Sequence, residues 1–222
     1  MKKVILASQS PRRKELLQQV IKEFEVEAAD IDERTIQERV MANGGGEPFL
    51  ERAKTLVEHL AEEKAKKVLD THPGALVIGA DTIVVQDDQI LGKPKDEEEA
   101  YAMLRSYAGR SHAVLTGFSI QTREKVVSRS VETEVRFFEW NGQMDREMKQ
   151  YVASGSPMDK AGAYGIQEEA ALWVAEIHGD YPNVIGLPVA YVNRALQEFF
   201  GQVALKKEVS GAGHLLNSLK DL

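Results

Sequence analysis

One carboxylate lies in the middle of the most apolar stretch of this chain. Asp81 interrupts the run Leu-Val-Ile-Gly-Ala-Asp-Thr-Ile-Val-Val, residues 76–85, which is typical of a buried β-strand. An ionised carboxylate at such a position is costly unless a cation compensates its charge. Carboxylates placed in this way hold a metal ion, act as a general base, or neutralise a structural Lys or Arg. We therefore expect a cation or a metal ion beside Asp81.

A second group of polar side chains follows the first short apolar run of the chain. Ser8 and Ser10 precede Pro11, and Ser10 is a good N-cap for a helix with proline at its first position. Arg12 and Arg13 then fall in the first turn, where the helix dipole disfavours cations. A bound anion would remove this conflict, so the serines, arginines and backbone N–H groups describe a phosphate site. The alternative is a solvated basic pair.

Two lysines elsewhere could reach the same place. Lys64 interrupts the apolar stripe of a helix expected over residues 48–69. Its stem could lie on the core with the amine in water, or the amine could point at Asp81 or a phosphate. Lys160 stands among small residues in the segment 154–167, where the backbone could approach a ligand closely.

The position of Lys93 depends on the register of a hairpin that follows the central strand. We expect Gln86 to pair with Gln89 across a turn. Counting on, Lys93 then lies opposite Thr82, on the face away from Asp81. A slip of one residue would instead move Lys93 to the face of Asp81. In either register a further cation comes close to the carboxylate.

The remaining pattern predicts the elements that position these residues. The alternating segments 111–121 and 125–138, separated by a three-residue turn, predict antiparallel strands, with His112 packed in the core rather than catalytic. Short strands are also expected over residues 4–7, 25–28 and 171–177. Helices are expected from Ser10 to Ile21 and over residues 48–69, 96–107, 143–153 and 187–200. The glycine-rich segment 39–48 is expected to be a loop.

Composition narrows the classes of function. The chain has 222 residues, 43% of them hydrophobic, enough for one large domain or one domain in two lobes. It carries 28 Lys and Arg against 35 Asp and Glu, and the net charge of −7 argues against a partner that is a nucleic acid polymer. Cysteine is absent, which excludes disulfides and thiolate chemistry. No apolar run suits a signal peptide or a membrane span, so we expect a cytoplasmic protein without a membrane partner.

Five motifs follow one another along the chain: Ser8 with Ser10 to Leu17, Gly79 to Thr82, Gly92 to Pro94, Asp159 to Gln167, and Gly186 to Pro188. Together, in this order, they resemble the Maf family of nucleoside triphosphate pyrophosphatases. The resemblance covers about residues 1–200, so we expect one domain there and a C-terminal tail over 201–222. It implies an α/β fold with a mixed, strongly twisted sheet flanked by helices, in two lobes with a central cleft, as in inosine triphosphate pyrophosphatases. It also implies, in many members, a homodimer.

The resemblance also implies an activity and assigns roles to residues. The implied reaction is hydrolysis of a nucleoside triphosphate to the monophosphate and pyrophosphate, assisted by Mg²⁺ or Mn²⁺. Asp81 would be the proton acceptor, and Asp81 with Glu33 would suit a Mg²⁺ ion that also binds substrate phosphates. The residues implied at the substrate are Ser8, Arg12, Arg13, Lys64, Thr82, Lys93, Lys160 and Gln167.

Three of these residues indicate which nucleotide base the protein would select. Arg12, Thr82 and Gln167 resemble the branch of the family that acts on dTTP and UTP, rather than the branch that acts on 7-methyl-GTP. A glutamine amide has a donor and an acceptor, which match the edge of uracil or thymine. Thr82, on the face opposite Asp81, could shape a pyrimidine pocket, whereas Gln167 could instead cap its loop.

One function of a different class stays open from sequence. A non-catalytic regulator of septum formation that binds nucleotide, or a protein partner, would need the phosphate cluster but no carboxylate in the central strand. Asp81 favours the enzyme.

Overall fold

The structure of the protein is a computed structural model that describes residues 3–42 and 46–207. Its elements follow the chain in this order: β1 (Val4–Ala7), α1 (Pro11–Leu17), β2 (Glu25–Val26), α2 (Glu33–Ala42), α3 (Phe49–Thr71), β3 (Leu76–Gln86), β4 (Gln89–Leu91), α4 (Glu97–Tyr107), β5 (Ser111–Gln121), β6 (Val126–Phe137), α5 (Gly142–Ala153), the 3-10 turns η1 (Ser156–Asp159), η2 (Ala161–Ala163) and η3 (Glu169–Trp173), β7 (Val174–His178), α6 (Tyr181–Ile185) and α7 (Val189–Lys207).

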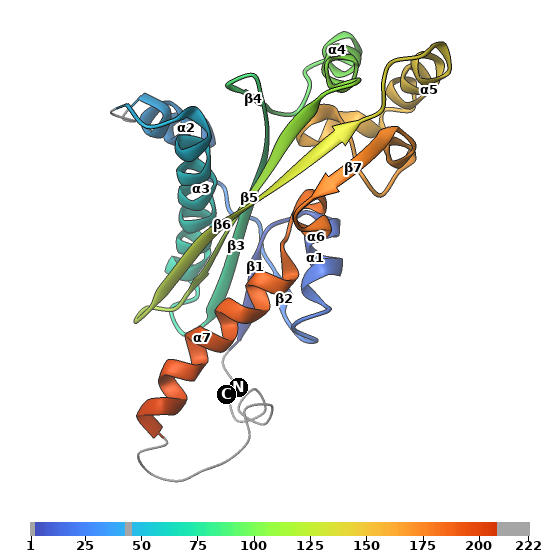
Figure 1. The fold of residues 1–222 in the computed structure, drawn as a ribbon. Helices are drawn as coiled ribbons and strands as arrows, with labels where there is room; N and C mark the ends of the chain where they lie inside the picture. Colours follow the sequence, from blue (N-terminus) through green and yellow to red (C-terminus); the bar gives the residue numbers. More distant parts are fainter. Residues whose placement is uncertain (1–2, 43–45, 208–222) are drawn as a thin grey trace.

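Within the described residues, seven strands form one mixed sheet. Its order is β2-β1-β3-β5-β6-β7, and β4 pairs with the end of β3. The first three strands in this order are parallel, and the pairs from β3 to β7 are antiparallel. Helix α3 lies along one face of the sheet, and α1, α6 and α7 lie on the other (Figure 1). The expected α/β fold with a mixed, twisted sheet is confirmed.

Strand β3 contributes side chains to both faces of the sheet, because successive side chains of a strand point to opposite sides. Leu76, Ile78 and Ala80 belong to the core under α1 and α7. The intervening residues, among them Gly79 and Asp81, therefore face α3. This alternation delivers the carboxylate to the helix that carries Lys64.

Two glycines let α3 approach the sheet closely. A Cβ on Gly79 would lie 2.2 Å from the backbone oxygen of Ala61, and one on Gly117 would lie 2.1 Å from that of Val57. Gly117 pairs with Asp81 across the ladder between β3 and β5. Both positions therefore require glycine, and both are close to the carboxylate.

The molecule has two lobes. One is built around α1, α3 and α7 on the two faces of the sheet. The other is built around α4, α5 and the 3-10 turns, at the far end of the strands, where a separate core includes Tyr107, Tyr151 and Trp173. Figure 1 shows α4 and α5 at one end of the long β5 and β6 strands, away from α7.

Some elements differ from expectation. Glu33 begins the helix α2, which extends into the glycine-rich segment expected to be a loop, and the middle of that segment, residues 43–45, lies outside the described residues. Strand β2 has two residues instead of four, α1 ends at Leu17, and the short helix α6 is not among the helices expected from the sequence. Helix α7 continues to Lys207, and the rest of the predicted tail lies outside the described residues.

Candidate active site

A cleft of about 360 Å³ opens where the predicted phosphate residues gather. Its walls come from the β1–α1 turn, the segment after β2, the start of α2, helix α3, the segment after β4, and η1. Residues from both lobes therefore meet in it. The lining residues are Ala7, Ser8, Gln9, Ser10, Pro11, Arg12, Arg13, Ala28, Ala29, Glu33, Lys64, Lys93 and Asp159.

Lys64 forms the centre of an ion cluster in this cleft. Its Nζ lies 2.5 Å from Oδ1 of Asp81 and 2.7 Å from Oε1 of Glu33. The side chains of Lys64 and Asp81 are each only 12% exposed, so the strand carboxylate is buried together with its counter-ion. Of the two alternatives for Lys64, the one that points its amine at Asp81 is confirmed. Asp81 does not itself line the cleft but contacts a residue that does.

Lys93 reaches the cleft by a different route from the one expected. Gln86 pairs with Gln89, as predicted, and the Asp-Asp turn forms with both residues in the left-handed region. The strand β4 ends at Leu91, however, so Lys93 is not paired opposite Thr82. The chain turns away instead, and the Gly92 carbonyl accepts a hydrogen bond of 3.0 Å from Gly162 N. Lys93 thus lines the cleft from an irregular segment tied to the other lobe.

Most of the hydrogen-bond donors of the Arg13 guanidinium are paired with other groups of the protein. Its Nε donates to the Gly186 carbonyl at 2.9 Å, and its terminal nitrogens donate to the Ala80 carbonyl at 2.9 Å, to Ser8 Oγ at 3.3 Å and to Thr82 Oγ1 at 3.0 Å. Burial lowers the pKa of its guanidinium, and the charge of Asp81 acts in the opposite direction. Arg13 therefore ties α1 to β3 next to the carboxylate, while its edge still lines the cleft.

Of the three residues expected to select the base, Arg12 lines the cleft, whereas Thr82 and Gln167 lie outside its lining. The hydroxyl of Thr82 is within 3.0 Å of both Arg13 and Thr116 Oγ1, on the face away from Asp81, as its position in the strand predicts. Gln167 is exposed, on the loop that also carries Lys160. Their roles at the base stay predictions.

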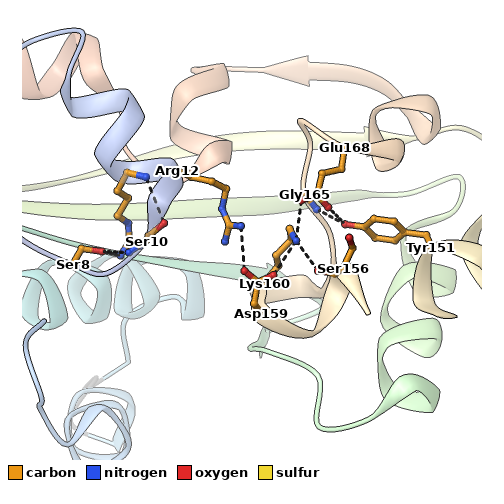
Figure 2. A network of polar contacts seen from close by, with 10 residues as sticks. Ser8, Ser10, Arg12, Tyr151, Ser156, Asp159, Lys160, Gly165 and Glu168 are labelled. Carbon is orange, nitrogen blue, oxygen red and sulfur yellow. Dashed lines mark hydrogen bonds and ion pairs between the residues drawn. The ribbon is translucent and has the colours of Figure 1, made fainter. Parts of the chain in front are cut away.

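A polar network joins Arg12 to the second lobe. Arg12 lies with its guanidinium 3.3 Å from Oδ2 of Asp159, and Figure 2 shows it pointing across from α1 to that carboxylate. Lys160 is buried, and its amine donates to Asp159 Oδ1 at 2.9 Å and to the Ser156 carbonyl at 2.6 Å and forms an ion pair with Glu168 Oε1 at 2.9 Å (Figure 2). Three oxygens of its own loop thus surround the amine, which favours a role in holding the loop.

Sequence reasoning missed Asp159. It was noticed only as part of a motif, although it directly precedes Lys160 and its carboxylate lines the cleft. The signal that could have found it is a carboxylate next to a lysine in a segment of small residues, which indicates a local ion pair. The partner across the cleft, Arg12, could not be found without the fold because it lies 147 positions away in the chain.

His112 is packed rather than catalytic, as predicted. It is 3% exposed, its Nε2 lies 2.7 Å from the Tyr164 hydroxyl, and its ring contacts Tyr107 and Phe137. Burial lowers the pKa of His112 to about 3, so its imidazole is neutral at neutral pH. The pair anchors Tyr164, and with it the loop that carries Lys160.

The donor chemistry of the cluster fits a divalent ion such as Mg²⁺. Asp81 and Glu33 each direct a carboxylate oxygen at the same point, the amine of Lys64. Hard oxygen donors from one or two carboxylates, completed by substrate phosphates and water, are the usual protein ligands of Mg²⁺. Among the residues described, no group of three or more His, Asp or Glu side chains could hold a metal without substrate.

Comparison with known proteins identifies the family. The Maf-like protein family matches residues 3–199, nearly the whole described chain. The chain belongs to the Maf family.

Curated relatives agree over the same range. A protein of Bacillus cytotoxicus is 43% identical over 199 residues, covering 90% of this chain and 96% of the relative. A protein of a Geobacillus species is 45% identical over 197 residues, covering 89% and 98%. A protein of Symbiobacterium thermophilum is 46% identical over 200 residues, covering 90% and 95%. Each of the three is named dTTP/UTP pyrophosphatase. Searched over its described residues, this Maf protein has no helix long and apolar enough to cross a membrane.

Proposed function

We propose that this Maf protein hydrolyses dTTP and UTP to their monophosphates and pyrophosphate, with a divalent metal ion. One observation carries the proposal: the buried Asp81 and the exposed Glu33 both contact Lys64, beside a cleft lined by Arg12 and Lys93. An acidic protein that gathers cations from distant segments at one cleft is suited to a polyphosphate. The names of its curated relatives support dTTP and UTP as the substrates.

In the proposed reaction, a water oxygen bonds to the α-phosphorus and the bond to the α–β bridging oxygen breaks. The leaving group is pyrophosphate, and the proton of the water passes to Asp81. Asp81 is prepared for this because Oδ1 accepts from Lys64, while Oδ2 has no protein partner among the described residues. A metal ion held by Asp81 and Glu33 would stabilise charge on the phosphates.

The chain's own cations would bind the phosphates. Lys93 and Arg12 line the cleft, and their charges could offset those of the phosphate oxygens that develop in the transition state. Arg13 holds Ser8 and Thr82 in place around the site, and the proposed roles of Thr82 and Gln167 at the base follow from the family resemblance.

The test is a panel of nucleoside triphosphates assayed for pyrophosphate release. The panel includes dTTP, UTP, CTP, ATP, GTP and 7-methyl-GTP, each with Mg²⁺ and with Mn²⁺. We expect dTTP and UTP to be hydrolysed fastest, with pyrophosphate and the monophosphate formed in equal amounts. A preference for 7-methyl-GTP, or no hydrolysis of dTTP and UTP with either metal, would overturn the proposal.

Location and assembly stay predictions. We propose a cytoplasmic protein and a homodimer, both on the family resemblance. Light scattering of the purified protein would show the mass in solution, against 24.7 kDa for one chain.

A further inference from the structure

A negative charge faces the space in which phosphates would bind. Asp159 lines the cleft together with Arg12, Lys64 and Lys93. Burial alone would raise the pKa of Asp159, but the hydrogen bond from Lys160 and the charges of Lys160 and Arg12 outweigh this effect and lower it. The ionised carboxylate therefore repels a phosphate group placed beside it. A carboxylate at this position weakens phosphate binding, so phosphate binding alone does not explain its presence.

The two carboxylate oxygens of Asp159 contact different residues. Oδ1 accepts from Lys160, which is 7% exposed and is also held by Glu168 and the Ser156 carbonyl. Tyr151 supports Glu168 in turn, since its hydroxyl donates to Oε2 at 2.6 Å. Oδ2 alone faces Arg12 on the other lobe. The carboxylate is therefore fixed by its own lobe and would stay paired with Lys160 if Arg12 left (Figure 2).

Arg12 is the partner that can leave. Its contact with Asp159 is 3.3 Å long, and the carboxylate is 62% exposed. The Arg12 guanidinium makes no other hydrogen bond to any residue that the structure describes. Its guanidinium offers a planar fork of donors that fits two oxygens of a phosphate, and an exposed ion pair of this kind is weak. Exchange of a carboxylate for a phosphate would thus cost little.

We propose that the Asp159 carboxylate competes with the phosphate groups of a ligand for the Arg12 guanidinium. Asp159 binds the guanidinium in the free protein, is displaced by a phosphate of the ligand, and binds the guanidinium again as pyrophosphate leaves. Asp159 thereby limits the affinity of the cleft for phosphate groups and favours release of the product. The inference rests on the proposed function only in requiring a ligand with linked phosphates.

Calorimetric binding of inorganic pyrophosphate, without nucleotide, tests the exchange. The variants are Asp159→Asn, Arg12→Ala, the double variant, and Asp70→Asn, which makes the same change of charge at an exposed position of α3. Asp159→Asn is expected to bind pyrophosphate about two- to fivefold more tightly than wild type, the range that corresponds to an exposed ion pair. Asp70→Asn should leave binding unchanged, and Asp159→Asn should bring a smaller gain when Arg12 is alanine, because only the direct repulsion between carboxylate and phosphate is then removed.

The outcomes separate this inference from others. Unchanged or weaker binding by Asp159→Asn, an equal gain in the double variant, or no pyrophosphate binding by any variant would each overturn it. Thermal melting checks that the variants fold, and Asp159→Ser is the substitute if the asparagine variant does not. If wild type and variants bind pyrophosphate in the expected order but the wild-type protein hydrolyses no triphosphate, the proposed function is contradicted and the proposed exchange stands.

Discussion

The proposed role of Asp81 depends on the contrast between its two oxygens. Oδ1 is fixed by Lys64, and Oδ2 has no partner among the described residues. Lys64 in turn compensates the buried charge, which would otherwise cost several kcal/mol. The presence of the cation follows from the strand sequence alone, because a carboxylate in an apolar run requires one. Which cation it is follows from the fold.

Replacement of Asp81 by asparagine should abolish turnover and keep the fold. The amide has nearly the same shape but can neither accept the proton nor bind a metal ion well. We expect kcat for dTTP to fall by at least 10²-fold, the order of effect typical of a general base. Turnover near the wild-type rate by a folded Asp81→Asn protein, with circular dichroism as the check of folding, would remove Asp81 from the reaction.

At the scale of elements, the close approach of α3 to the sheet positions Lys64. Gly79 and Gly117 leave room for the helix backbone, and Lys64 extends from that helix to Asp81. Alternation along β3 predicted that Asp81 and Thr82 lie on opposite faces, and the helical spacing of α3 showed that Lys64 interrupts the apolar stripe, with its amine either in water or directed at Asp81 or a phosphate. The joining of these two elements across the sheet depends on tertiary packing, which periodicity does not encode.

Gly79→Ala should damage both stability and activity. The added methyl group would meet the Ala61 carbonyl, so α3 must shift and Lys64 must move with it. We expect a loss of about 1–3 kcal/mol in the free energy of unfolding, as for other overpacked sites, together with a lower kcat. The control is Gly74→Ala, where a methyl group would meet nothing within 4 Å. Equal stability of the two variants in urea would contradict this account of the packing.

Long regular elements could be predicted from the sequence, whereas short or irregular segments could not. The long strands β5 and β6 were predicted well because their alternation extends over many residues. The short helix α6 and the start of β7 were not, since a few residues carry too little periodicity to separate a turn from a helix. Lys93 was placed near Asp81 by an assumed strand pairing, yet it reaches the cleft from an irregular segment that only tertiary contacts fix.

Acid should weaken the whole fold partly through His112. Burial lowers the pKa of this imidazole to about 3, below the ordinary value of 6.5 that it regains on unfolding. Its contribution to stability is therefore complete above pH 6.5, falls as the pH drops, and is lost by about pH 3. At pH 5 the loss is on the order of 2 kcal/mol.

Urea unfolding at pH 7 and pH 5 measures this effect. His112→Gln cannot titrate but keeps a polar group for the Tyr164 hydroxyl. The difference between the two pH values should be smaller in His112→Gln than in wild type. An equal difference would show that His112 is not the group responsible.

At the scale of the whole molecule, two lobes bring charges from distant parts of the chain to one cleft. The β1–α1 turn, α2, α3, the segment after β4, and η1 each supply lining residues, although the protein carries a net charge of −7. Local concentration of cations rather than total charge is thus what suits the cleft to a polyphosphate. We propose that this cleft directs water to the α-phosphorus of dTTP or UTP.

Hydrolysis of dTTP in ¹⁸O-labelled water tests that claim most directly. Mass spectrometry of the products shows which phosphorus the water attacked, because the labelled oxygen stays on it. Attack at the α-phosphorus places one ¹⁸O atom in dTMP and none in pyrophosphate, which is the result we predict. Label in pyrophosphate with unlabelled dTMP, or release of orthophosphate with dTDP, would contradict the account.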